Sequence, residues 1–195
     1  FFYRLSSEDD FHFDGTDFVR FALENRVDTV CIINPNNPNG GYISSTSMRE
    51  LLHAFSDMEL VILDESFVEF AYEDELRGRL SLAPQLSSLT NVVLMKSMSK
   101  DFGIAGIRAG YAIMNPERVE RLLSNGFLWN SSGLAEFFFR LFGEEEFQRS
   151  YAEVRLRYLD EAAAFFGELE DVAGIRPFSS KANFCLVRLD DTIPV

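Results

Sequence analysis

The sequence predicts an α/β protein in which helices flank a mostly parallel β-sheet. Helix-like segments alternate along the chain with short apolar runs, and this alternation is typical of layered α/β folds. The runs are apolar throughout and not at every second residue, which indicates strands buried on both faces. Polar residues follow three of the runs, as expected where a sheet of this kind presents a ligand site.

The first half of the chain supplies most of that sheet. We expect helices near residues 17–25 and 47–55, because apolar side chains recur there with helical spacing. We expect strands near residues 29–33, 60–64 and 91–95, where the apolar runs are too short for helices.

Helices dominate the chain after the third strand. Asn115 is a good N-cap and Pro116 suits the first helical position, so a helix should run from there to about Ser124. Residues 132–167 read as mostly helical, with a break near Gly143.

The end of the chain indicates a second, smaller α+β domain. A helix over residues 147–166 is long enough to link two domains. Two strands are expected beyond it, near 176–178 and 183–189. We therefore divide the chain into a large domain, residues 1–145, and the start of a truncated small domain, residues 146–195.

Composition limits the classes of partner. The 195 residues carry a formal net charge of -13, which argues against a nucleic-acid or anionic-membrane partner because both require clustered Lys and Arg. No stretch reaches the ~20 apolar residues of a membrane span. The start at Phe1, without Met, and the end at Val195 give the impression of a fragment of a longer protein.

Cysteine and histidine give no support for a disulfide framework or a metal site. Cys31 and Cys185 each lie in an apolar, strand-like run, so we expect buried thiols and a reducing, cytoplasmic compartment. His12 and His53 have no metal-ligand spacing to each other or to a Cys, and we expect them at the surface.

Three apolar runs end in polar groups that together form a candidate site. The first leads into the Asn/Pro/Gly-rich loop 34–41, the second into Asp64 and Glu65, and the third, after Lys96, into Lys100. An ionised Asp at the end of a buried strand needs a cation or several hydrogen-bond donors. A Lys in the same layer could be that cation, in which case a structural ion pair would also explain both residues.

The motifs at these positions resemble those of the class I and II aminotransferases. Residues 97–111 read Ser-Met-Ser-Lys-Asp-Phe-Gly-Ile-Ala-Gly-Ile-Arg-Ala-Gly-Tyr, similar to the family's lysine signature with an Arg eight residues after the Lys. Residues 37–40, Asn-Pro-Asn-Gly, resemble its Asn-Pro-Thr-Gly turn, and residues 64–67, Asp-Glu-Ser-Phe, its Asp-Glu-Ala-Tyr segment. The three motifs occur in the family's order.

The resemblance implies the aspartate-aminotransferase fold, with a three-layer large domain, and pyridoxal 5'-phosphate (PLP) as cofactor. Lys100 would form the Schiff base with PLP and afterwards move the substrate proton. Asp64 would pair with the pyridine nitrogen and keep it protonated, and Asn37 would donate to the phenolic oxygen. Arg108, with Ser97 and Ser99, would hold the phosphate. No metal is implied.

The sequence departs from the common family pattern at Phe67, where most relatives have a Tyr that donates to the phenolic oxygen of PLP. Without that donor, we expect the lysine–PLP linkage to keep its proton to higher pH than in relatives with Tyr. Phe at this position is a feature of the threonine-phosphate decarboxylase branch, close to the histidinol-phosphate aminotransferases. Trp129 and Asn130 lie about where that branch contacts substrate, although Trp129 could equally be a core residue, and Asn183 resembles a residue near the substrate carboxylate.

The first hypothesis for function is an aminotransferase acting on an amino acid or amino-phosphate substrate. An alternative is a PLP-dependent decarboxylase of an amino acid phosphate, which Phe67 and Trp129 favour. A second alternative, a non-catalytic module of PLP fold, is opposed by the presence of a Schiff-base lysine at Lys100. The resemblance implies small-molecule amino donors and acceptors, and a homodimer, because relatives complete each site with residues of the partner. It also places further site segments before Phe1 and after Val195.

Overall fold

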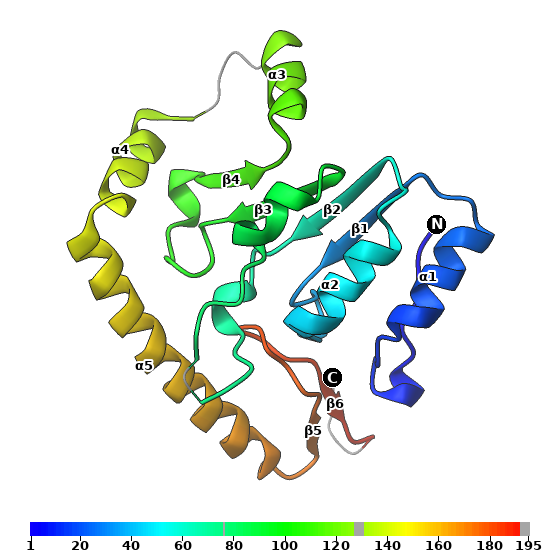
Figure 1. The fold of residues 1–195 in the computed structure, drawn as a ribbon. Coiled ribbons are helices and arrows are strands. Elements are labelled where there is room, and N and C mark those ends of the chain that lie inside the picture. Colours follow the sequence, from blue (N-terminus) through cyan, green and yellow to red (C-terminus); the bar gives the residue numbers. More distant parts are fainter. Residues whose placement is uncertain (76, 127–130, 192–195) are drawn as a thin grey trace.

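The computed structural model describes residues 1–75, 77–126 and 131–191 (Figure 1). Its helices and strands are, in chain order, α1 (Gly15–Glu24), β1 (Thr29–Ile33), α2 (Ser45–Ala54), β2 (Leu60–Asp64), β3 (Val92–Ser97), β4 (Gly110–Ile113), α3 (Pro116–Ser124), α4 (Gly133–Phe142), α5 (Glu145–Glu170), β5 (Ile175–Pro177) and β6 (Val187–Leu189). Short 3-10 helices are η1 (Ser7–Asp9), η2 (Val68–Phe70), η3 (Ala83–Ser88) and η4 (Ala105–Ile107).

Sheet A is the centre of the fold and contains β1, β2, β3 and β4 in that spatial order. The first three strands are parallel, with Ile33 opposite Asp64 and Asp64 opposite Met95. β4 returns antiparallel to β3 and places Gly110 opposite Ser97. The carboxyl ends of β1, β2 and β3 therefore lie together at one edge of the sheet, as Figure 1 shows.

Capping residues explain where the observed helices differ from the predicted ones. α1 and α2 begin two residues before the expected starts because Asp14 and Ser44 cap them. The Asp14 carboxylate accepts from Thr16 N at 2.8 Å and Asp17 N at 3.0 Å. The predicted N-cap role of Asn115 is confirmed, since its side chain accepts from Glu117 N at 2.9 Å.

One face of sheet A is covered and forms the main core. The inward residues of the three parallel strands are at most 5% exposed and pack against α1 and α2. The strand residues are Val30, Ile32, Val61, Leu63, Val92 and Leu94, and the helix residues are Phe18, Ala22, Met48, Leu51 and Leu52. Figure 1 shows both helices on the same side of the sheet. Their aromatic and aliphatic side chains supply most of the hydrophobic stabilisation in this part of the chain.

The opposite face of sheet A, here called the open face, is only partly covered by the described residues. Cys31 is exposed, Met95 is 44% exposed, and Ile62 and Val93 are half-buried. The prediction that the strands are buried on both faces is thus confirmed for one face and wrong for the open face within the described part of the chain. The prediction that both cysteines are buried is wrong: Cys31 points to the open face, and Cys185 is half-buried in the irregular segment before β6.

α5 runs from α4 along one side of the molecule to the second sheet (Figure 1). Its buried residues Tyr151, Arg155 and Leu159 recur every four positions and so form one stripe on the helix. Sheet B pairs β5 with β6 antiparallel, with Ile175 opposite Leu189. The domain boundary at residues 145 and 146 stays a prediction.

The predicted strand over residues 183–189 is wrong in its first part, because β6 comprises Val187–Leu189 only. The Ser180 hydroxyl donates to Phe184 O at 2.5 Å and accepts from Ala182 N at 3.0 Å, which bends this segment back on itself. Among the described residues, no helix combines the length and the apolar character needed to cross a bilayer.

Candidate active site

The carboxyl edge of sheet A brings the three predicted motifs together. Beyond the ends of the strands, Asn34 N donates to Asp64 O and Glu65 N donates to Met95 O, each at 2.9 Å. These bonds extend the parallel ladder into the loops. The residues that follow β1, β2 and β3 are consequently held at fixed positions relative to one another.

The loop after β1 presents Asn37 from a rigid frame. The buried Asn34 amide donates to Ile43 O at 2.9 Å and accepts from Ile43 N at 2.8 Å, which closes the base of the loop. Within the loop, the Asn36 amide donates to Asn39 Oδ1 at 2.8 Å. Asn37 is exposed at the tip, as a residue that contacts a ligand must be.

Gly40 joins this loop to the segment before β6. Its φ is +72°, and a Cβ at this position would lie 1.9 Å from Ser180 Oγ, so only glycine fits. Lys181 N donates to Gly40 O at 2.9 Å. Next to this contact Ala182 is buried while Asn183 is exposed, so the predicted substrate residue Asn183 lies on a segment fixed to the Asn37 loop.

A chain of hydrogen bonds links Asp64 to the serines before Lys100. The Asp64 carboxylate accepts from Ser66 N at 2.8 Å, and Ser66 Oγ accepts from Ser97 N at 3.0 Å. The Ser97 and Ser99 hydroxyls lie 2.5 Å apart and share a hydrogen bond. Ser66 was not predicted as a site residue, and only its position inside the Asp-Glu-Ser-Phe motif could have indicated it.

Lys100 is exposed, and its Nζ lies 5.6 Å from the centroid of the Phe67 ring. Phe67 is 7% exposed and is held edge-on by Phe184 at a centroid distance of 5.0 Å. An ammonium above an aromatic face is attracted by the ring quadrupole. Phe67 therefore supports Lys100 with its ring face, and it has no hydroxyl to offer a ligand.

Arg108 has a left-handed backbone conformation, with φ +61°, which is uncommon for a residue other than glycine. One guanidinium nitrogen donates to Ala105 O at 3.0 Å, and the side chain is exposed. Next to it, Ala109 O accepts from Met98 N at 3.1 Å. Arg108 is thereby tied to the segment that follows β3 and carries Ser99.

These side chains, Asn37, Asp64, Ser97, Ser99, Lys100 and Arg108, are called the site cluster below. PLP requires an amine for its aldehyde, donors for a phosphate dianion and a carboxylate for its ring nitrogen. The cluster supplies each group: an exposed ammonium, two hydroxyls with a guanidinium, and a carboxylate that begins a hydrogen-bonded chain leading to the hydroxyls. The residues fit the group. Trp129 and Asn130 lie outside the described residues.

A second polar cluster, which was not predicted, lies beneath the site. It consists of Glu65, Glu69, Lys96, Asp101, Tyr151 and Arg155, all with buried side chains, and is called the buried cluster below. Lys96 Nζ lies 3.4 Å from Asp101 Oδ2, and Arg155 Nε lies 3.1 Å from Glu69 Oε2. The four-residue spacing of Tyr151 and Arg155 on a predicted helix was the one available signal, and it indicates only a shared helix face.

Burial perturbs the ionisable groups of this second cluster. It raises the pKa of the Glu65 carboxyl above its ordinary value, against hydrogen bonds from Leu82 N at 2.9 Å and from the Ser81 hydroxyl. It lowers the pKa of the Arg155 guanidinium, which Glu69 partly offsets. The ion pair with Glu69 offsets part of the cost of desolvating Arg155, whereas Glu65 is held by neutral hydrogen-bond donors.

Comparison with known proteins gives one family over almost the whole chain. The family Aminotransferase class I and II matches residues 1–192. L-serine phosphate decarboxylase of Campylobacter jejuni is 42% identical over 190 residues, which are 97% of this chain and 49% of that protein. The chain spans about half the length of the curated relatives it matches.

Solved structures agree with this assignment. A decarboxylase from Sulfurospirillum multivorans matches with a TM-score of 0.93 at 41% identity, over 98% of this chain and 54% of that chain. The histidinol-phosphate aminotransferase of Clostridium acetobutylicum matches with a TM-score of 0.78 at 29% identity, over 94% of this chain and 53% of that chain. The α/β fold with a mostly parallel sheet, and the family predicted from the motifs, are confirmed.

Proposed function

Because the chain belongs to the class I and II aminotransferase family, whose cofactor is PLP, we propose that the intact protein decarboxylates an amino acid phosphate. The main observation in support of this proposal is the 42% identity to an L-serine phosphate decarboxylase across 97% of the chain. The aminotransferase hypothesis has weaker support, since the histidinol-phosphate aminotransferase structure is 29% identical. L-serine phosphate is accordingly the first substrate to test.

When bound, PLP supplies an aldehyde that condenses with amines and a ring that accepts the electron pair of a broken bond at the substrate's α carbon. The chain's own residues hold and orient that group. Lys100 would provide the attaching amine, and Ser97, Ser99 and Arg108 would hold the phosphate with hydroxyls and a guanidinium. Asp64 would keep the ring nitrogen protonated, because a carboxylate beside it favours the charged form.

After release of carbon dioxide, a proton must replace the carboxyl group on the α carbon. Lys100 would deliver it, since a primary amine freed from the cofactor can carry a proton to an adjacent carbon. Asn37 would donate to the phenolic oxygen of the cofactor. Phe67 has no hydroxyl and would contribute only its aromatic ring. Among the residues of the three motifs, Asn37 would therefore be the donor to that oxygen.

The experiment uses the full-length protein with PLP and L-serine phosphate, with and without a 2-keto acid as amino acceptor. We expect carbon dioxide and the corresponding primary amine in equal amounts, independent of the acceptor. The Lys100→Ala variant should bind PLP without a borohydride-fixable visible band and should release no carbon dioxide.

Acceptor-dependent formation of a new amino acid, without carbon dioxide, would instead support the aminotransferase hypothesis. Absence of both products together with a normal visible band would mean that the substrate class is wrong while the cofactor assignment holds. The homodimer, the contacts of Asn183 with substrate and the cytoplasmic location stay predictions.

A further inference from the structure

Asp101, which follows Lys100 in the chain, has a buried carboxylate that contacts Lys96 and Tyr151. The Asp101 side chain is 3% exposed and lies 3.4 Å from the Nζ of Lys96, which is itself on β3 four residues before Lys100. Asp101 Oδ2 also accepts a hydrogen bond from the Tyr151 hydroxyl at 2.8 Å. Among the described residues, Asp101 Oδ1 accepts none, so Tyr151 is the single hydrogen-bond donor to this carboxylate within the described part of the chain.

The ring of Tyr151 holds the next residue as well. Phe102 stacks on it with a centroid distance of 4.4 Å and an interplanar angle of 23°. Met98, on the other side of Lys100, is 1% exposed and packs in the same cluster as Phe102. The backbone on both sides of Lys100 is therefore anchored, while the Lys100 side chain remains exposed.

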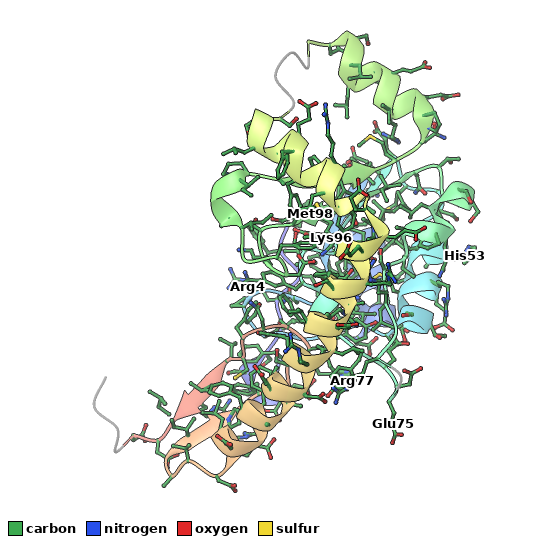
Figure 2. The ribbon with its side chains drawn as sticks, turned by 90° about the vertical axis from the view of Figure 1, so that its left-hand side faces the viewer. Arg4, His53, Glu75, Arg77, Lys96 and Met98 are labelled. Atoms are coloured by element: carbon green, nitrogen blue, oxygen red, sulfur yellow. The ribbon has the colours of Figure 1, made fainter. Side chains whose placement is uncertain are left out.

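Tyr151 itself has a fixed position because α5 is anchored one turn further on. Arg155 donates to Glu69 O at 2.7 Å, to Arg77 O at 2.7 Å and to Ala71 O at 3.1 Å. Figure 2 shows α5 passing in front of Lys96 and Met98 and, lower down, beside Arg77. α5 thus contacts both the segment that carries Lys100 and the segment that follows Phe67.

We propose that Tyr151 is a positioning residue for Lys100, which it orients through Asp101. This inference rests on the proposed role of Lys100 as the attachment point of PLP. Because Tyr151 lies on the helix that leads to sheet B, the position of α5 sets the position of the reactive amine.

The chemistry of the contact suits a positioning role. A buried carboxylate that loses its hydrogen-bond donor must find another donor or move. Burial and the nearby charges of Glu69 and Asp101 raise the pKa of Tyr151 far above its ordinary value, so the hydroxyl remains a donor at every pH at which the protein would work. A shift of Asp101 moves Lys100, its chain neighbour, relative to Ser97 and Ser99.

The test measures covalent capture of PLP by the full-length apo protein. PLP is added at several concentrations, samples are reduced with borohydride at timed intervals, and the modified Lys100 peptide is quantified by mass spectrometry. Two quantities result: the limiting rate of attachment, and the PLP concentration that gives half of it. Tyr151→Phe keeps the stacked ring and removes the hydroxyl, and Tyr158→Phe is the matched control, because Tyr158 is an exposed tyrosine on the same helix.

We expect Tyr151→Phe to lower the limiting rate about 10- to 100-fold, as a small misplacement of a reacting group does. The half-saturating concentration should change little, because the phosphate-binding side chains remain. Tyr158→Phe should match wild type. A limiting rate unchanged in Tyr151→Phe overturns the proposal, even if its melting temperature falls, since a merely structural role would lower stability alone.

If Tyr151→Phe does not fold, Asp101→Ala replaces it, because this variant removes the acceptor of the Tyr151 hydroxyl. The readout is then hydrogen–deuterium exchange of residues 97–102 in the apo protein. Faster exchange there than in wild type supports the proposal, and unchanged exchange overturns it. Modification of a lysine other than Lys100 in wild type would show that the proposed function's lysine is wrong, which is a separate failure.

Discussion

The site cluster and the buried cluster use the same kinds of residue, a few positions apart in the chain, for opposite purposes. Asp64 and Glu65 are neighbours, yet strand alternation puts Asp64 with the half-buried residues of the open face and Glu65 with the covered core. Lys100 is exposed above Phe67, whereas Lys96 is 5% exposed beside Asp101. The residue type alone therefore does not indicate the role of a side chain, whereas its burial and its contacts do.

The difference predicts which property each cluster controls. In the buried cluster Lys96 is paired with Asp101 and Arg155 with Glu69, so removing either cation takes the nearest partner from a buried carboxylate. The charged ends of Lys100 and Arg108 are exposed, so removing one should affect ligand binding and chemistry more than folding. Substitutions in the two clusters should thus separate activity from stability.

The largest effect is expected for Lys100→Met in the full-length protein. Loss of the amine removes both cofactor attachment and the proton carrier, so turnover should fall by about 10³-fold or more. The urea midpoint of the apo protein should match wild type, because the side chain is exposed. A large loss of stability in the apo variant would mean that Lys100 is a structural cation and would remove the distinction between the clusters.

Arg155→Met should have the opposite result. Glu69 loses the nearer of its two ion-pair partners, keeping Arg79 at 3.7 Å, and the carbonyls of Glu69, Ala71 and Arg77 lose a donor. The loss should destabilise the protein by about 3–5 kcal/mol. Urea denaturation of the apo protein measures this. Arg157→Met is the control, because Arg157 is exposed on the same helix. Equal stability of the two variants would show that the buried contacts of Arg155 do not contribute to the stability of the folded protein.

The pH dependence of stability gives a smaller effect from the buried cluster. Burial raises the pKa of Glu65 in the folded state, so its contribution is full below the pKa of an unfolded Glu and is lost as pH rises through the folded value. The stability of Glu65→Gln should therefore improve relative to wild type as pH rises from about 4 to 7. The measurement is the urea midpoint at each pH.

The same substitution at Glu75, an exposed side chain, is the control for the charge change itself. Wild type and Glu75→Gln should then show parallel pH curves. If Glu65→Gln is also parallel to wild type, the Glu65 carboxyl is ionised as readily in the folded protein as in the unfolded one, and the account of this cluster is wrong.

Much of the fold and the site cluster could be predicted because short local sequence patterns determine both. The strands at 29–33 and 60–64 have the predicted bounds, since apolar runs and turn residues mark them directly. The buried cluster could not be predicted, because Tyr151 and Asp101 are 50 residues apart and nothing local indicates their contact. The exposure of Cys31 was missed for a related reason. An apolar run does not indicate which face of the strand the rest of the chain packs against.

Phe67→Tyr is the smallest change and tests how strictly the site cluster depends on this ring. The added hydroxyl could donate to the phenolic oxygen of PLP and so release the proton of the lysine–PLP linkage at lower pH. A hydrogen bond worth about 0.5–1.5 kcal/mol corresponds to a shift on the order of 1 pH unit or less in the visible titration. Phe70→Tyr adds a hydroxyl in the same aromatic cluster and should leave the titration unchanged. If Phe67→Tyr also titrates like wild type, the residue at position 67 does not influence the pH at which the lysine–PLP linkage loses its proton. Phe67, whose ring lies under Lys100 Nζ, is then a packing residue of the core.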